Sequence, residues 1–302
     1  MPQAVRFTEH GGVEVLRVAE VERPVAGPGQ VLVRVKAAGI NPIESASRAG
    51  RMEWKWPTTF PAGQGSDLAG VVEALGEGVE GFRPGDEVLG FSRVRGTHAE
   101  FALAESGDLV PKPAGVPWEQ AGALYIVGTA AYAAVRAVAL EPGETVAVSG
   151  AAGGVGSIAV QLAKRAGASV IGLASPANHG WLTARGVRPV AYGEGAADRI
   201  GPVDAFIDTF GAGYVELAIG LGVRPERVNT IIDFEAASRH GTRAEGNEDA
   251  ATPVVLAELA ALIERGELSI PIAGTYPLVE VGLAFAELEK RHTHGKIVLT
   301  LP

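Results

Sequence analysis

The residues with the clearest chemistry form a glycine-rich turn between a short apolar strand and a helix. Residues 144–167 have the sequence ETVAVSGAAGGVGSIAVQLAKRAG, and the apolar stretch ASVIGLAS follows at 168–175. In this order, glycines permit a tight turn, close approach of a diphosphate and close packing of the helix on the strand, although Ala151 replaces the usual first glycine. Free N–H groups and the helix dipole favour an anion there. We therefore predict a dinucleotide site, the alternative being a turn that binds nothing. Its residues are Ala152, Gly153, Gly154, Val155 and Gly156.

The end of the second strand carries no acidic residue. In NAD sites an Asp or Glu at this point bonds the ribose 2′-hydroxyl, and it would repel a 2′-phosphate. Here Ser175 and Asn178 can hydrogen-bond a phosphate, and His179 adds charge when it is protonated. We therefore expect the cofactor to be NADP(H), with these three residues at the 2′-phosphate. Ser175 also suits an ordinary N-cap of the next helix, and both roles can hold together.

The periodicity of the chain changes near its middle. Residues 1 to about 110 alternate short apolar stretches with turns such as RPGD at 83–86, which is typical of a barrel-like β domain. From residue 144 strands alternate with helices, which indicates a doubly wound parallel sheet. The last strand, 296–301, fits the β domain better. We predict an α/β fold, with a β domain at 1–122 and 270–302 and a nucleotide-binding domain at 123–269, and we expect the polar stretch 238–251 to be a surface loop.

Composition argues against several classes of function. The 302 residues carry a net charge of −9 and no basic cluster, so we expect no nucleic acid partner. There is no cysteine, which excludes disulfides and thiolate zinc sites. His292 and His294 suit a metal pair or, more simply, a polar turn, and we predict no metal. No signal-peptide pattern and no apolar run of about 18 residues is present, so we expect no membrane partner and a cytoplasmic location.

Further motifs lie along almost the whole chain. They are AAGINPIE at 37–44, GSDLAGVV at 65–72, FRPGDEVLGF at 82–91, GTHAEFALA at 96–104, IVGTAAYAAV at 126–135, GAAGGVGSIAVQLAK at 150–164, DAFIDTFG at 204–211 and HGKIVL at 294–299. Together they resemble the medium-chain dehydrogenase/reductase superfamily, in its zinc-free quinone oxidoreductase branch. The resemblance implies a GroES-like β-barrel domain, a Rossmann NADP(H) domain and a homodimer formed through the edge of the Rossmann sheet. The zinc-dependent branch carries Gly-His-Glu where this chain has Gly65-Ser66-Asp67, so we expect no metal-assisted reaction.

The resemblance also suggests residues for the reaction and the nicotinamide. Asn41, stiffened by Pro42, would donate a hydrogen bond to a carbonyl oxygen of the acceptor, the alternative being a plain turn. Thr129, at the start of a helix, would contact the nicotinamide or only cap its own helix. Phe210, Ile232 and Phe234 follow two strands and would bind the nicotinamide half. Lys296 would reach a cofactor phosphate or end its strand in solvent.

Aromatic residues near the expected site are candidates for acceptor binding. Trp54 and Trp56 lie two residues apart and can stack on a flat acceptor such as a quinone, or simply cover the edge of the domain. Tyr125 can bond an oxygen, although a buried tyrosine is more often part of a core.

These observations leave three functions open. The leading one is NADPH-dependent reduction of a small quinone or α,β-unsaturated carbonyl compound by metal-free hydride transfer. A 2-enoyl thioester reductase is the second, but it needs basic residues at a channel mouth, for which only Arg48, Arg51 and Lys55 lie near Asn41 in sequence. A non-catalytic NADPH-binding or RNA-binding protein is the third, and the acidic composition weakens its RNA-binding form.

Overall fold

The computed structural model describes residues 1–302, which form two compact units. The first contains residues 1–126 and 252–302, and the second contains residues 127–251. The segment 252–269, expected in the nucleotide-binding domain, lies with the first unit. The reason is α10 (Pro253–Glu264), which packs on β7 (Leu109–Pro111) and whose Glu264 carboxylate accepts a hydrogen bond from the Gly115 N–H at 3.4 Å. None of the helices combines the length and the apolar character that crossing a bilayer requires.

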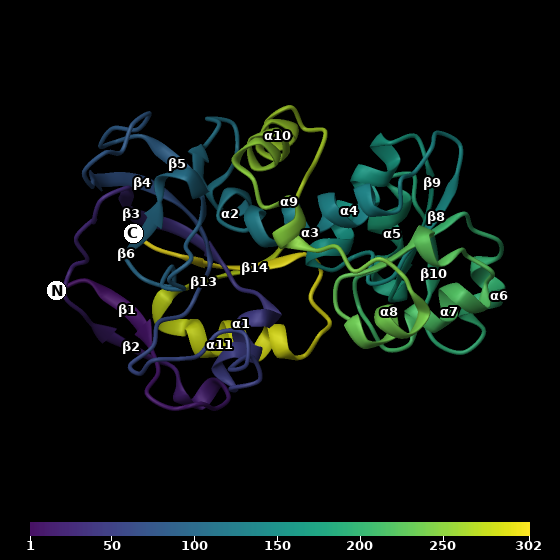
Figure 1. Ribbon diagram of the computed structural model, residues 1–302, viewed down its shortest axis with the longest axis horizontal. Coiled ribbons are helices and arrows are strands. Elements are labelled where there is room, and N and C mark those ends of the chain that lie inside the picture. Colours follow the sequence, from purple (N-terminus) through teal and green to yellow (C-terminus); the bar gives the residue numbers. More distant parts are fainter. The chain divides into compact units, whose positions relative to one another are not determined.

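The first unit is built mainly on antiparallel strands (Figure 1). A seven-stranded sheet has the order β13-β14-β3-β4-β5-β7, and β6 also pairs with β3. Only β13 and β14 run parallel to each other, and β1 and β2 form a separate ribbon. The strands not yet defined are β1 (Gln3–Arg6), β2 (Arg17–Glu20), β3 (Gln30–Gly39), β4 (Asp67–Leu75), β5 (Glu87–Phe91), β6 (Phe101–Glu105), β13 (Ile272–Pro277) and β14 (Lys296–Thr300).

The core of this unit joins the two ends of the chain. Val31, Val33 and Val35, which alternate along β3, share one buried cluster with Phe285 of α11 (Val281–Glu289). The C-terminal strand β14, yellow in Figure 1, lies between β13 and β3. Two further helices in this unit are α1 (Pro42–Arg48) and α2 (Trp118–Ala121), and the boundary between the units falls inside α3 (Leu124–Ala137).

The second unit is a five-stranded sheet with the order β10-β9-β8-β11-β12, in which every pairing is parallel. The chain order reverses at β8, which makes the carboxyl edge of this strand the switch point where doubly wound sheets bind ligands. The predicted fold class is therefore confirmed. The strands are β8 (Thr145–Val148), β9 (Ser169–Ala174), β10 (Arg188–Ala191), β11 (Ala205–Asp208) and β12 (Val228–Thr230), and the connecting helices are α4 (Gly154–Arg165), α5 (His179–Thr183), α6 (Ala196–Ile200) and α7 (Tyr214–Gly220).

The stretch 238–251 is more ordered than the loop that its polarity predicted. It contains the end of α8 (Phe234–His240) and the helix α9 (Asn247–Ala250). Between them, Arg243 forms an isolated β-bridge with Asn229 of β12. The buried Asn229 amide donates to the Glu245 carbonyl at 3.0 Å and accepts from the Glu245 N–H at 2.8 Å. One buried side chain therefore fixes a polar segment that has no apolar period of its own.

Candidate functional site

The glycine-rich turn leads from the end of β8 into α4. The Gly153 N–H donates to the Gly150 carbonyl at 2.8 Å, and the first helical bond runs from the Ser157 N–H to the Gly153 carbonyl at 2.9 Å. The N–H groups of Gly154, Val155 and Gly156 precede that bond and have no acceptor within the chain. A long helix that begins in this way presents several donors and a positive dipole end to an anion.

Close packing explains the last glycine of the motif. A Cβ on Gly156 would lie 2.1 Å from the Gly150 carbonyl oxygen, whereas a Cβ on Gly153 would lie 3.2 Å from the same atom. Gly156 therefore lets the helix pack closely against the turn, as the sequence predicts. The glycines of the turn have no side chains that could cover the free N–H groups. This arrangement fits a diphosphate group. Ala152, in contrast, is buried behind the turn.

Ser175, Asn178 and His179 lie together beyond the carboxyl end of β9. The Asn178 amide donates to the Ser175 hydroxyl at 3.1 Å, and His179 Nε2 lies 3.3 Å from the Ala174 carbonyl oxygen. Ser175 occupies the N-cap position of a short 3-10 turn, but its side chain makes no cap hydrogen bond. The structure thus brings together the predicted 2′-phosphate residues with no carboxylate among their partners.

Apolar side chains are exposed at the loops after β11 and β12. Phe210 is 37% exposed, Ile232 45% and Phe234 61%, so three large apolar side chains reach solvent in these loops. A Cβ on Gly211 would lie 3.3 Å from Ile232, so the two loops lie against each other. Below them lies the buried carboxylate of Asp208, which the sequence analysis missed although it stands at the end of a strand in the motif DAFIDTFG.

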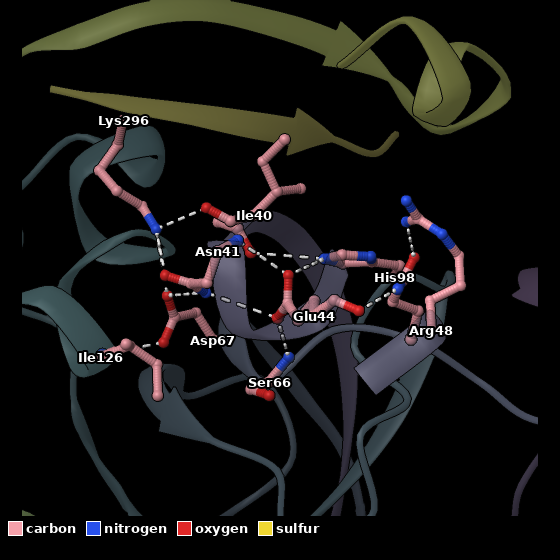
Figure 2. Close-up of polar contacts among 11 residues, drawn as sticks. Ile40, Asn41, Glu44, Arg48, Ser66, Asp67, His98, Ile126 and Lys296 are labelled. Carbon is pink, nitrogen blue, oxygen red and sulfur yellow. Dashed lines mark hydrogen bonds and ion pairs between the residues drawn. The ribbon is translucent and has the colours of Figure 1, made fainter. Parts of the chain in front are cut away.

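In the first unit, Asn41 lies at the centre of a buried polar cluster (Figure 2). Its amide nitrogen donates to Asp67 Oδ2 at 3.1 Å and lies 3.4 Å from Glu44 Oε1, and its amide oxygen accepts from Lys296 Nζ at 2.5 Å. Lys296 also donates to the Ile40 carbonyl at 2.8 Å and lies 3.7 Å from Asp67 Oδ2. Asn41 is thus saturated by the protein, so donation to an acceptor carbonyl would require it to release a carboxylate.

The structure places Lys296 inside this cluster and away from solvent. We expected its ammonium to reach a cofactor phosphate or to lie in solvent at a strand end. Instead it is buried, and its contacts are with Ile40, Asn41 and Asp67. A cation among buried carboxylates stabilises the cluster, and the contact of Lys296 with a cofactor phosphate stays a prediction.

The two carboxylates of the cluster were also missed, although one has a sequence signal. Glu44 stands three residues after Asn41, and the pair forms a capping box at the start of α1. Glu44 accepts from the Asn41 N–H at 2.9 Å and from the Ser66 N–H at 3.0 Å. Asp67 accepts from the Ile126 N–H at 2.9 Å. These bonds tie α1 to the start of β4 and to α3.

Burial dominates the titration of this cluster. Desolvation raises the pKa of Glu44 to about 7 and that of Asp67 to about 6, against the opposing effects of N–H donors and the Lys296 charge. Desolvation also lowers the pKa of Lys296, and it lowers the pKa of the buried His98, which lies 3.9 Å from Glu44, to about 4. The cluster therefore contains carboxyl groups that titrate close to neutral pH.

The remaining predicted residues have varied surroundings. Thr129 is buried in the interior of α3 and does not cap a helix, because the helix begins at Leu124. Tyr125 is buried and stacks on Phe91, with ring centroids 4.6 Å apart. Trp54 is 80% exposed, whereas the Trp56 ring has the Arg95 guanidinium 3.8 Å from its centroid. Of the three aromatic residues suggested for acceptor binding, Trp54 is the most exposed.

No group of three or more His, Asp or Glu residues is placed to hold a metal ion, and cysteine is absent. Arg48, one of three basic residues considered for a thioester channel, is buried and pairs with Glu289 at 2.7 Å. It anchors α1 to α11 and is not exposed at any channel mouth.

Two protein-family models match the chain. The alcohol dehydrogenase GroES-like domain matches residues 27–128, and a model described as zinc-binding dehydrogenase matches residues 194–299. A quinone oxidoreductase of Pseudomonas aeruginosa is 32% identical over 99% of both chains. A quinone oxidoreductase of Rattus norvegicus is 40% identical, but this match covers 57% of the chain and only 52% of the relative.

Two further similarities bear on fold and activity. The solved structure of the quinone oxidoreductase from Coxiella burnetii superposes with a TM-score of 0.90 at 29% identity, covering 100% of this chain and 99% of that one. A region of the erythronolide synthase EryA2 of Saccharopolyspora erythraea is 32% identical over 94% of this chain and 8% of that protein.

Proposed function

Because the chain belongs to the medium-chain dehydrogenase/reductase superfamily, in its quinone oxidoreductase-like branch, we propose that it is an NADPH-dependent reductase of quinones or related α,β-unsaturated carbonyl compounds. The full-length similarity to a quinone oxidoreductase is the observation that carries the substrate class. The open N-terminus of α4 supports a dinucleotide as the cofactor.

The chain's own residues would bind and orient the cofactor. The N–H groups of 154–156 hold the diphosphate, and 175–179 hold the 2′-phosphate. The exposed apolar residues after β11 and β12 cover the nicotinamide half. When bound, NADPH supplies a hydride to the acceptor; with a quinone, the hydride brings two electrons and one proton, and water supplies the second proton.

The acceptor side is proposed to work without a metal ion. Lys296 supplies the positive charge inside the Asn41 cluster, and this cluster holds α1 and the Asn41-Pro42 segment in place. Asn41 is therefore assigned to positioning of this segment in preference to direct donation. Trp54 is the aromatic residue best exposed to stack on a flat acceptor, and Thr129 remains a candidate for contact with the nicotinamide.

A second candidate is the reduction of 2-enoyl thioesters. A region of the erythronolide synthase EryA2 is 32% identical to 94% of this chain, so a unit of this kind also occurs within a synthase. Both reactions use a hydride acceptor conjugated to a carbonyl group, so the same cofactor geometry serves either one.

Cofactor oxidation with a panel of acceptors separates these functions. The purified protein is mixed with NADPH or NADH and with 1,4-benzoquinone, a cyclic enone or crotonyl-CoA, and loss of the reduced cofactor is followed by absorbance. We expect NADPH oxidation with the quinone or enone, and slower oxidation of NADH. Preferential turnover of crotonyl-CoA would favour the thioester reductase. Tight NADPH binding without oxidation by any acceptor would indicate the non-catalytic protein and overturn the proposal.

A further inference from the structure

Asp208 is a buried carboxylate at the carboxyl end of β11, surrounded by neutral donors. Its Oδ1 accepts from the Ser149 hydroxyl at 2.6 Å and from the N–H groups of Phe210 and Gly211 at 3.0 and 2.9 Å. Its Oδ2 accepts from the Thr230 hydroxyl at 2.8 Å. The side chain is fully buried, and no Lys, Arg or His forms an ion pair with it.

The direction of each hydroxyl bond is fixed by its neighbours. Ser149 Oγ accepts from the Thr209 N–H at 2.9 Å, so its own proton points to Asp208. Thr230 Oγ1 accepts from the N–H groups of Ile232 and Asp233 at 3.3 and 3.0 Å, so its proton also points to Asp208. Donors fill both carboxylate oxygens, which matches the ionised form of the side chain. The site is therefore a buried negative charge without a counter-cation.

This charge connects the ends of three strands at the edge expected to bind the cofactor. Ser149 follows β8, Asp208 ends β11 and Thr230 ends β12. The phosphate-binding turn also follows β8, and β11 and β12 lie on the side of β8 opposite β9 and β10. A dinucleotide with its diphosphate at α4 and its 2′-phosphate beyond β9 extends its other half over the β11 and β12 loops. These loops are the ones that the Asp208 network holds.

We propose that Asp208 is a positioning residue that holds these two loops and that also favours the oxidised over the reduced form of the bound cofactor. The inference rests on the proposed NADP(H) function. The nicotinamide ring becomes positively charged when it gives up a hydride, so a nearby buried anion stabilises NADP⁺ relative to NADPH. Bound NADPH is then a stronger reductant than it would be above a neutral side chain.

The variant Asp208→Asn tests the charge with little change of shape. In the variant, the Oδ1 atom of Asn can accept the same three hydrogen bonds, and its amide nitrogen faces the Thr230 hydroxyl oxygen. We expect the ratio of Kd for NADP⁺ to Kd for NADPH, measured by calorimetric titration, to rise about five- to twentyfold, the order expected for one unit charge at an intermediate dielectric. A tenfold change in this ratio corresponds to about 30 mV in the potential of the bound pair.

Two matched variants separate charge from loop positioning. Asp204→Asn removes the same charge at the exposed amino end of β11, where the carboxylate accepts only the Thr145 N–H, and we expect an unchanged ratio. Thr230→Val breaks the network but keeps the Asp208 charge, and we expect both Kd values to rise by the same factor.

The outcomes keep the inference and the proposed function distinct. An unchanged ratio in Asp208→Asn, with NADP(H) still bound, would overturn the redox role of Asp208 alone. An equal shift of the ratio in Asp204→Asn would show that the effect does not come from the buried network. Failure of the wild-type protein to bind either form would overturn the proposed function itself.

Discussion

Lys296 illustrates at the residue scale how a buried cation supports polar groups around it. Its ammonium lies in a cluster with two carboxylates, and Asn41 bridges all three groups. Removing the cation would leave two acidic groups in a low-dielectric environment with only N–H donors to stabilise their charge. Breaking a buried pair in this way is strongly destabilising, whereas breaking an exposed pair changes stability little.

The variant Lys296→Met should therefore lower the free energy of unfolding by about 3–5 kcal/mol. The matched control is Lys290→Met, whose ion pair with Glu287 is exposed to solvent, so its loss should change stability little. Urea unfolding of the two variants and the wild type measures the difference. Losses of similar size in both variants would mean that the buried cluster does not depend on Lys296.

Glu44 gives the cluster a dependence on pH. Its pKa is raised to about 7 in the folded protein, from an ordinary value of 4.5, because burial disfavours the charged form. The folded state therefore binds more protons than the unfolded state between these two values. The stability linked to Glu44 is fully present below pH 4.5 and is lost as pH rises through about 7, with a total change of about 3 kcal/mol.

Glu44→Gln should remove this dependence. We expect the variant to be less stable than the wild type at pH 5, because the amide nitrogen of Gln cannot accept a backbone N–H, whereas both oxygens of the protonated carboxyl group can. The gap should shrink by about 2.5 kcal/mol by pH 8, since only the wild type has to charge a buried carboxyl group. Urea unfolding at both pH values measures the gap, and an unchanged gap would refute the assignment of the titration to Glu44.

At the scale of elements, the turn between β8 and α4 depends on the absence of a side chain. A Cβ on Gly156 would meet the Gly150 carbonyl oxygen at 2.1 Å and the Ala151 Cα at 2.9 Å, both backbone atoms. No rotamer change can relieve these contacts, so the helix would have to move away from the turn. The free N–H groups would move with it.

Gly156→Ala is therefore expected to lower the free energy of unfolding by about 2–4 kcal/mol and to weaken NADPH binding at least tenfold. Gly220→Ala, at the end of α7, is the control, because a Cβ there meets no atom within 4 Å. It should change stability by about 1 kcal/mol or less, with a gain favoured by helix propensity. Thermal unfolding and NADPH titration report the two effects. Normal binding by Gly156→Ala would contradict the geometry assigned to the turn.

The sequence predicts the elements that local pattern determines. Regular alternation predicts β3, and the strand–turn–helix context predicts the start of α4. Three placements could not be obtained in this way. Asn229 orders the polar segment 241–246 through contacts across 16 residues, Lys296 meets Asn41 across 255 residues, and α10 joins the first unit through packing. Such long-range contacts leave no period in the sequence.

At the scale of the whole molecule, the edge of the parallel sheet bears on assembly. The homodimer implied by the family resemblance would use this edge. In the structure the Thr230 N–H donates to the Arg243 carbonyl at 3.1 Å, and the Arg243 N–H donates to the Val228 carbonyl at 2.9 Å, so the chain pairs with its own edge strand. A second copy would therefore have to use the outer side of the segment around Arg243 or the other edge strand, β10. The homodimer stays a prediction.

The central claim is that backbone N–H groups at the start of α4 bind the diphosphate of a nicotinamide dinucleotide. A crystal structure of the protein grown with NADPH tests it most directly. We predict diphosphate oxygens within hydrogen-bond distance of the N–H groups of Gly154, Val155 and Gly156, with the 2′-phosphate beside Ser175 and Asn178. A dinucleotide bound elsewhere, or an empty turn at saturating NADPH, would contradict the account.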